Sequence, residues 1–169
     1  MHYFLTTLMI MTTMSSMAQD GKASTIKKTF SRQTKVSIAI DADAAIVWAL
    51  LTNAGDFPRW NSTITSLEGK IQLGEKIRLK STLDDKRTFK IKVKEFVPEK
   101  RMVWGDGKGK RIFTLSPEGE GKLRFSMDEK MGGLMFPLYA KYIPPFDEAF
   151  EQFASDLKKE AETIQSGTN

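Results

Sequence analysis

The chain has no cysteine, and its single histidine, His2, lies within residues 1–18. The remaining residues therefore offer no thiol nucleophile, no imidazole base and no His or Cys ligand for a metal. These absences exclude hydrolases with a histidine base, zinc enzymes with His or Cys ligands, haem ligation through histidine and thiol redox chemistry. Asp, Glu, Lys, Tyr, Ser and Arg are left for any catalysis, and we expect neither a metal nor another cofactor.

Charged side chains are also missing from residues 1–18, MHYFLTTLMIMTTMSSMA, which contain no Lys, Arg, Asp or Glu. An apolar run covers 4–11, and Ser16 and Ala18 are the small residues of a signal-peptidase site. A membrane-spanning helix needs about 20 apolar residues, more than this run contains. We therefore expect a signal peptide cleaved near Ala18 and export to the periplasm or the medium. A retained amphipathic leader and a membrane anchor are the alternatives.

The remaining residues are too few for two domains of ordinary size. Residues 19–34 are polar, mixed in charge and weakly patterned, which predicts a flexible leader. We expect one ligand-binding domain over 35–165 and a short tail over 166–169.

The domain is expected to begin with a strand and two short helices. Every second residue is apolar in Lys35–Ile40, as in a half-buried strand. Asp41 and Asp43 can cap a helix over 44–51, and the sequence FPRW at 57–60 then turns the chain.

Residues 62–131 read as short strands separated by turns, such as those at 97–100 and 116–121. Successive hairpins of this kind form an antiparallel sheet with one dry face. Residues 146–164 follow with apolar side chains at three- and four-residue steps, which predicts a long helix with one buried stripe. The fold class is therefore α+β, with about seven strands curved around the C-terminal helix.

Three stretches resemble a known family: IAIDADAAIVWALLTNAGDFPRWN, KVKEFVPEKRMVW and RIFTLSPEGEGKLRF. Their order and spacing are similar to the START-like, polyketide cyclase or SRPBCC superfamily, over about 35–164. The resemblance implies the helix-grip fold and the binding of a hydrophobic small molecule. A minority of the superfamily are cyclases or other enzymes, so the resemblance also leaves an enzymatic activity open.

Strand alternation predicts which side chains face solvent. The outward set consists of Lys76, Arg78, Lys80, Lys90, Lys92 and Lys94. With the net charge of +5, this face could meet phosphates or an anionic surface. No aromatic side chains interleave with these lysines as base-stacking platforms, so we expect a solvated face and no nucleic-acid partner.

The last hairpin is expected to pair its apolar residues. This places Phe113 opposite Phe125 and Leu115 opposite Leu123, and Met102 and Trp104 opposite Glu95 and Val93. Arg111 and Glu129 then fall on the inner face. They could form a pair that orients a polar ligand group or closes the end of the sheet, or they could reach solvent at the rim. No catalytic residue is assigned, although Arg111 and Glu129 are candidates.

The inner face is expected to hold the ligand because ligand pockets are mostly apolar with a few placed polar groups. The apolar loop 132–145 could close over it as a lid or pack permanently on the helix. The candidate ligand-binding residues are Trp60, Leu79, Ser81, Phe89, Ile91, Val93, Met102, Trp104, Phe113, Phe125, Met127, Met135, Phe136, Tyr139, Phe146, Phe150 and Phe153.

Three functions fit these features. The first is a non-enzymatic binding or carrier protein for a lipid- or polyketide-like molecule, whose presence should change the fluorescence of Trp60. The second is a cofactor-free cyclase or dehydratase that uses Glu129, Arg111 or Tyr139. The third is an interaction domain acting through its basic surface, without stable membrane insertion.

Overall fold

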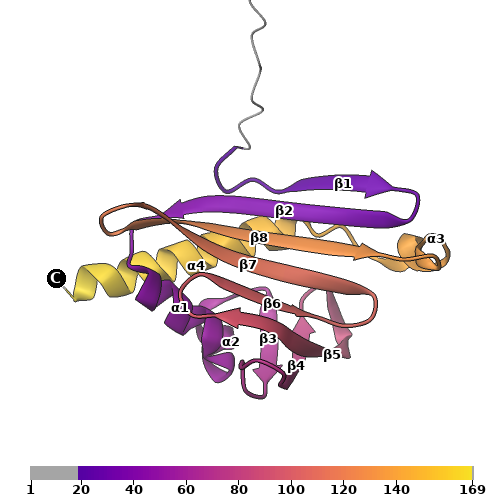
Figure 1. Ribbon diagram of the computed structural model, residues 1–169, viewed down its shortest axis with the longest axis horizontal. Helices are drawn as coiled ribbons and strands as arrows, with labels where there is room; N and C mark the ends of the chain where they lie inside the picture. The colour runs from indigo at the N-terminus through magenta and orange to yellow at the C-terminus, as the bar shows by residue number, and fades with distance from the viewer. Residues whose placement is uncertain (1–18, 169) are drawn as a thin grey trace, which may run out of the picture.

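The computed structural model describes residues 19–168, so the predicted signal peptide lies outside the described part. Figure 1 shows one curved sheet with a long helix running behind it. The strands are β1 (Ser24–Lys28), β2 (Ser31–Ile40), β3 (Ile64–Glu68), β4 (Lys76–Ser81), β5 (Asp84–Val97), β6 (Arg101–Gly105), β7 (Gly109–Gly119) and β8 (Lys122–Gly132). The helices are α1 (Ala44–Thr52), η1 (Ala54–Asp56), α2 (Phe57–Trp60), α3 (Phe136–Tyr139), η2 (Ala140–Tyr142) and α4 (Asp147–Gly167).

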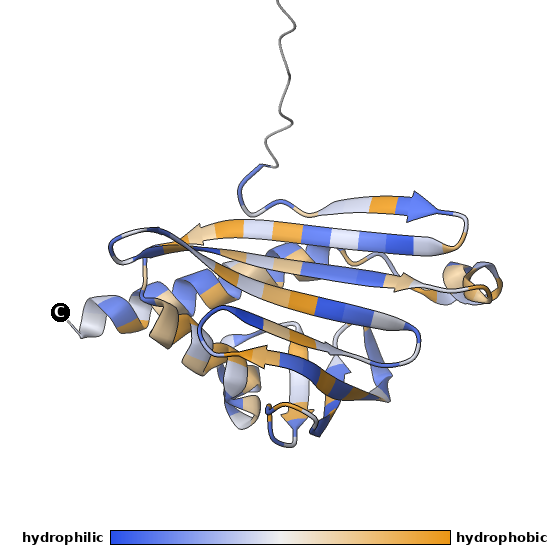
Figure 2. Cartoon of the chain, viewed as in Figure 1, coloured by the Kyte–Doolittle hydropathy of each residue, from blue (hydrophilic) through white to orange (hydrophobic). Residues whose placement is uncertain are grey.

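The eight strands lie in the order β1-β2-β8-β7-β6-β5-β4-β3, and all neighbours are antiparallel. Short helical segments follow β2, and α4 packs mainly on β2, α1 and β8. The predicted α+β helix-grip class is therefore confirmed, with eight strands in place of about seven. Apolar and polar residues alternate along the strands, as the colour bands in Figure 2 show, because successive side chains point to opposite faces.

The additional strand, β1, lies where the sequence predicted a flexible leader over 19–34, so that prediction is wrong from Ser24 onwards. Strand β1 is an edge strand that exposes four of its five residues, and therefore lacks the apolar alternation that marks a strand. The residue before β1 is attached to α4 by a polar contact: the backbone N–H of Ala23 donates to Glu151 Oε1 at 3.0 Å. The predicted tail over 166–169 is likewise partly helical, because α4 extends to Gly167.

The predicted register of two hairpins is wrong by a small shift. In β7 and β8, Phe113 lies opposite Met127 and Leu115 opposite Phe125, two residues from the predicted pairing. The same faces stay inward, because a shift of two preserves the side-chain alternation. A bulge between Val93 and Glu95 keeps Trp104 opposite Val93 but places Met102 opposite Phe96.

The interior between sheet and helix is filled by aromatic rings. Phe153 of α4 is 1% exposed, and its ring centroid lies within 6.2 Å of those of Phe57, Trp60, Phe113 and Phe125. Aromatic pairs at these separations attract each other in addition to burying area. The middle of the grip is therefore closed by packing, and a cavity lies toward one end of the sheet.

Candidate functional site

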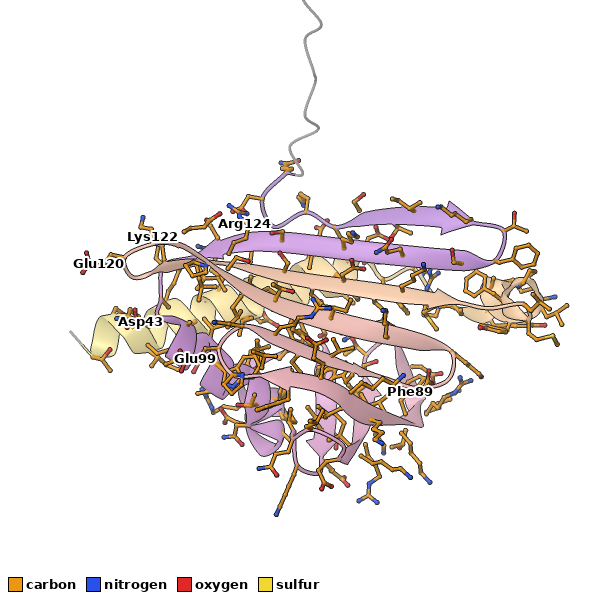
Figure 3. The ribbon with its side chains drawn as sticks, in the orientation of Figure 1. Asp43, Phe89, Glu99, Glu120, Lys122 and Arg124 are labelled. Carbon is orange, nitrogen blue, oxygen red and sulfur yellow. The ribbon has the colours of Figure 1, made fainter. Side chains whose placement is uncertain are left out.

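A cavity of about 650 Å³ lies at the end of the sheet opposite the β7–β8 turn. Its walls come from β4, β5, β6 and the adjoining ends of β7 and β8, with the segment from Tyr139 to Phe146 across the opening. Figure 3 labels Phe89 at this end of β5 and, at the far end, Glu120 in the β7–β8 turn and Lys122 at the start of β8.

Seven of the predicted ligand-binding residues line this cavity. Trp104 is 2% exposed and Leu79 is 8% exposed, so both form its floor rather than its rim. The seven are Leu79, Ser81, Phe89, Ile91, Trp104, Tyr139 and Phe146. They come from β4, β5, β6 and the segment that precedes α4, and the fold brings them together as the sheet curves.

The other predicted ligand-binding residues do not line the cavity. Most are buried in the packed interior: Trp60, Val93, Met102, Phe113, Phe125, Met127, Phe150 and Phe153. Phe136 is buried in α3, against Tyr139 and outside that interior. Met135 is 63% exposed on the surface beside α3. The alternation of side chains along the strands therefore identifies the inner face of the sheet, and this face forms both the cavity wall and the solid core.

Arg111 and Glu129 form an ion pair in the cavity wall. They are direct neighbours on β7 and β8, and Arg111 Nε and Nη2 each lie 2.5 Å from Glu129 Oε2. The side chains are only 14% and 16% exposed, and the guanidinium carbon lies 5.0 Å from the ring centroid of Phe150. The inward placement predicted for both residues is confirmed. The pair is the main charged feature where the cavity meets the packed core.

The outer rim of the cavity carries several charged side chains. Arg87 pairs with Asp84 at 3.4 Å, and both are on β5. Lys108 lies 5.5 Å from the ring centroid of Tyr139, a cation–π distance. Asp106 Oδ1 accepts the backbone N–H groups of Lys108 and Gly109 and so fixes the β6–β7 turn.

Arg32 lies within the range that was predicted to be a flexible leader, but it is 8% exposed and holds the segment before α4. Its Nη1 and Nη2 donate to the carbonyl oxygens of Ile143 and Pro144 at 3.1 and 2.7 Å. Its guanidinium also stacks 4.5 Å from the ring centroid of Phe146. Burial lowers the pKa of Arg32 from its ordinary value, while the carboxylates of Glu129 and Asp147 act in the opposite direction.

The sequence contained signals for some of the residues that were missed. Arg32 and Thr34 continue backwards the alternation of Val36, which points them inward. Met131 has the parity of Met127 and lines the cavity. Ile143 and Pro144 also line it, but their place at the cavity depends on the path of the chain after β8 and has no sequence signal.

Within residues 19–168, no three Asp, Glu, His or Cys side chains gather in an arrangement that could hold a metal ion. No helix in the same described range is both long and apolar enough to cross a membrane. The third predicted function rested on exposed lysines, and the six outward Lys and Arg residues of β4 and β5 are all exposed.

Comparison with protein families gives a match over residues 31–162 to the family described as polyketide cyclase / dehydrase and lipid transport. Comparison with curated protein sequences gives no match.

Solved structures give further matches at low sequence identity. A conserved protein of unknown function from Enterococcus faecalis is 14% identical with a TM-score of 0.62, over 85% of this chain and 78% of that one. A START superfamily protein from Mycobacterium smegmatis is 16% identical with a TM-score of 0.58, over 78% of this chain and 98% of the other. Norcoclaurine synthase from Thalictrum flavum, a point mutant in complex with a transition-state analogue, is 12% identical with a TM-score of 0.61, over 83% and 98%. At these identities the likeness establishes the fold alone.

Proposed function

Because the chain belongs to the polyketide cyclase / dehydrase and lipid transport family, we propose that it binds and carries a hydrophobic small molecule in the cavity described above. The observation that carries this proposal is the cavity itself, about 650 Å³ in volume and floored by Leu79, Ile91 and Trp104. Ligand pockets of about 300–1,000 Å³ with apolar walls are typical of small-molecule sites.

The polar groups of the cavity favour holding a ligand over transforming it. Arg111 and Glu129 bind each other: Glu129 Oε2 accepts a hydrogen bond from Arg111 Nε and lies 2.5 Å from Arg111 Nη2 in an ion pair. Breaking such a pair to bind a ligand leaves one charge without its partner, which is costly in a partly buried site. The ligand would therefore be held mainly through apolar contacts, with the hydroxyls of Ser81 and Tyr139, which line the cavity, available to orient it.

The test is native mass spectrometry of the full chain purified without detergent, followed by extraction. A co-purifying apolar molecule, or stoichiometric uptake of a long-chain fatty acid used as a probe, is the expected result. Failure of the purified protein to take up any apolar probe, across chain lengths that fit the cavity, would refute the carrier proposal.

A fluorescence prediction distinguishes the cavity from the packed interior. The chain has three tryptophans, of which Trp104 lines the cavity and Trp60 is buried against Phe57 and Phe153. We expect an apolar ligand to change the emission of Trp104, because emission depends on the solvent and groups around the indole. The prediction from the sequence was a change in the fluorescence of Trp60.

The measurement is a titration of wild type, Trp104→Phe and the matched control Trp60→Phe. We expect Trp104→Phe to remove most of the ligand-dependent change and Trp60→Phe to retain it. Loss of the signal in Trp60→Phe with retention in Trp104→Phe would place the ligand in the interior instead.

A second candidate function is a cofactor-free enzyme, because Glu129, Arg111 and Tyr139 all line the same cavity. In that case the protein would convert the extracted ligand, and Glu129→Gln would stop the conversion while leaving uptake intact. Recovery of the ligand unchanged after prolonged incubation with wild type supports the carrier instead.

The proposal includes export, which rests on the uncharged residues 1–18 and the small residues Ser16 and Ala18. Intact-mass measurement should find a mature chain that begins at Gln19 in the periplasmic or culture fraction. A full-length chain retained with the cells would contradict this part of the proposal and leave the binding part untouched.

A further inference from the structure

Three turns that are distant in sequence meet at the end of the sheet that holds the cavity. The N–H of Gly132 donates to the carbonyl of Lys108 at 3.1 Å, and the N–H of Gly133 donates to the carbonyl of Phe30 at 3.0 Å. These bonds join the β1–β2 turn, the β6–β7 turn and the segment 133–142, which contains α3. We call these three parts together the tip; Figure 1 shows α3 and the β1–β2 turn projecting at the same end.

The tip carries most of the exposed large apolar side chains of the described residues. Of the eight in residues 19–168, five belong to the tip: Phe30 (54% exposed), Leu134 (88%), Met135 (63%), Leu138 (64%) and Tyr142 (73%). Contiguous exposed apolar groups on a protein surface mark interaction sites more often than single ones do. The tip is therefore a candidate contact surface.

The local backbone and one buried side chain direct these apolar side chains toward solvent. Gly133 has φ +130°, a backbone conformation that side chains rarely adopt, and the N–H of Phe136 donates back to its carbonyl at 2.9 Å. Phe136 is 4% exposed and packs edge-on against Tyr139, with ring centroids 5.4 Å apart. Phe136 thus anchors the turn from inside, which leaves Leu134, Met135 and Leu138 pointing away from the protein.

The charge of the tip and of the strand ends beside it is positive. Within the tip, Lys108 lies in the β6–β7 turn and Lys141 in η2; beside it, Lys27 and Lys28 end β1 and Lys130 lies near the end of β8. Within residues 19–168, none of these five lysines makes an ion pair. The carboxylate of Asp106, in the same turn as Lys108, is directed to backbone N–H groups. An anionic partner is therefore complementary to the tip.

We propose that the tip docks on an anionic membrane surface, with Leu134, Met135 and Leu138 in the acyl boundary and the lysines at the headgroups. Apolar side chains flanked by Lys, with Tyr at the boundary, are the composition that suits a lipid interface. A stable protein interface needs about 800 Å² of surface on each partner. Because the tip consists of three small projecting parts, it favours a lipid surface over a protein partner. Tyr139, Tyr142 and Lys108 also line the cavity, so docking would bring its opening to the lipid surface.

The test is sedimentation of the full chain with phosphatidylcholine vesicles, with and without phosphatidylglycerol, and needs no cavity ligand. We expect binding to the vesicles with phosphatidylglycerol and at least about tenfold weaker partitioning for Leu134→Ser/Leu138→Ser. The matched control is Leu73→Ser/Val97→Ser, which removes two exposed apolar residues outside the tip and should bind as wild type.

A second pair of variants tests the charge. Lys27→Gln/Lys28→Gln should weaken binding roughly tenfold, whereas Lys76→Gln/Lys92→Gln, a cross-strand pair of exposed lysines with the same change in net charge, should not. Wild-type binding should fall as the ionic strength rises from about 0.05 M to about 0.5 M.

Several results would overturn the proposal: no binding to either vesicle, equal binding by the Leu134→Ser/Leu138→Ser variant, or equal losses in both lysine pairs. A concentration-dependent dimer that this leucine variant dissolves, without vesicle binding, would assign the tip to a second copy of the chain. The leucine and Lys27/Lys28 variants change residues outside the cavity lining, so ligand uptake should survive in them. The docking and the carrier proposals therefore fail separately.

Discussion

Phe153→Ala is expected to lower the free energy of unfolding by about 4 kcal/mol. Phe153 is 1% exposed, and four other aromatic rings surround it within 6.2 Å. Truncation removes the transfer free energy of the ring and leaves a cavity that these neighbours, fixed to the sheet and α2, can fill only in part. Since domains of this size are stable by about 5–15 kcal/mol, the variant should unfold at much lower urea concentration, as measured by circular dichroism.

Phe153→Leu keeps most of the volume and should cost about 1–2 kcal/mol. Tyr142→Ala, on an aromatic residue that is 73% exposed, should change the stability by less than about 0.5 kcal/mol. A cost for Phe153→Ala that is no larger than the Tyr142→Ala cost would mean that the rings do not pack as a solid core. The ligand cavity would then extend along α4, and the candidate site would have to be drawn more widely.

Side-chain parity in the strands predicted the inner face correctly but could not separate cavity from core. Phe113 and Arg111 share one face of β7, yet the first is buried under α4 and the second lines the cavity. The two residues differ in where they lie along β7 relative to the start of α4. Side-chain parity contains no information about this position, because whether α4 covers a residue depends on how far the sheet curves away from the helix.

The error over 19–34 has a different physical origin. Strand β1 is held by backbone pairing to β2 and by polar contacts such as Thr25 Oγ1 to Asp147 Oδ1 at 2.9 Å. Neither kind of contact requires apolar residues, so composition suggested a leader. Arg32 was the available clue, since a cation in phase with Val36 points into the protein and must find acceptors there.

The two-residue error in the β7–β8 register also bears on the site. Apolar matching favoured Phe113 opposite Phe125, whereas the observed turn sets Arg111 directly opposite Glu129. Cross-strand pairs of opposite charge stabilise a register by an amount similar to an apolar pair. The Arg111–Glu129 pair thus helps to fix the alignment of β7 and β8, which both border the cavity.

Arg111→Met is expected to cost about 3 kcal/mol of unfolding free energy, because Glu129 is left largely buried without its cation. Glu129→Gln should cost about 2 kcal/mol for the reciprocal reason, the smaller value reflecting the amide oxygen that can still accept from Arg111. These values stand at or below the lower end of the range for buried pairs, since both side chains keep some contact with solvent at 14% and 16% exposure. The measurement is urea denaturation of the single variants and of Arg111→Met/Glu129→Gln.

The double variant should lose clearly less than the sum of the two single losses, with a coupling free energy of about 2 kcal/mol. The matched control is the exposed cross-strand pair of Arg78 and Glu68, whose side chains are 62% and 57% exposed and whose nearest atoms lie 2.6 Å apart. Its coupling should stay below about 0.5 kcal/mol and fall with added salt. A coupling for Arg111 and Glu129 as small as that of the control would mean that water in the cavity solvates each charge independently. Both groups would then be free to contact a ligand, which would favour the enzymatic candidate over the carrier.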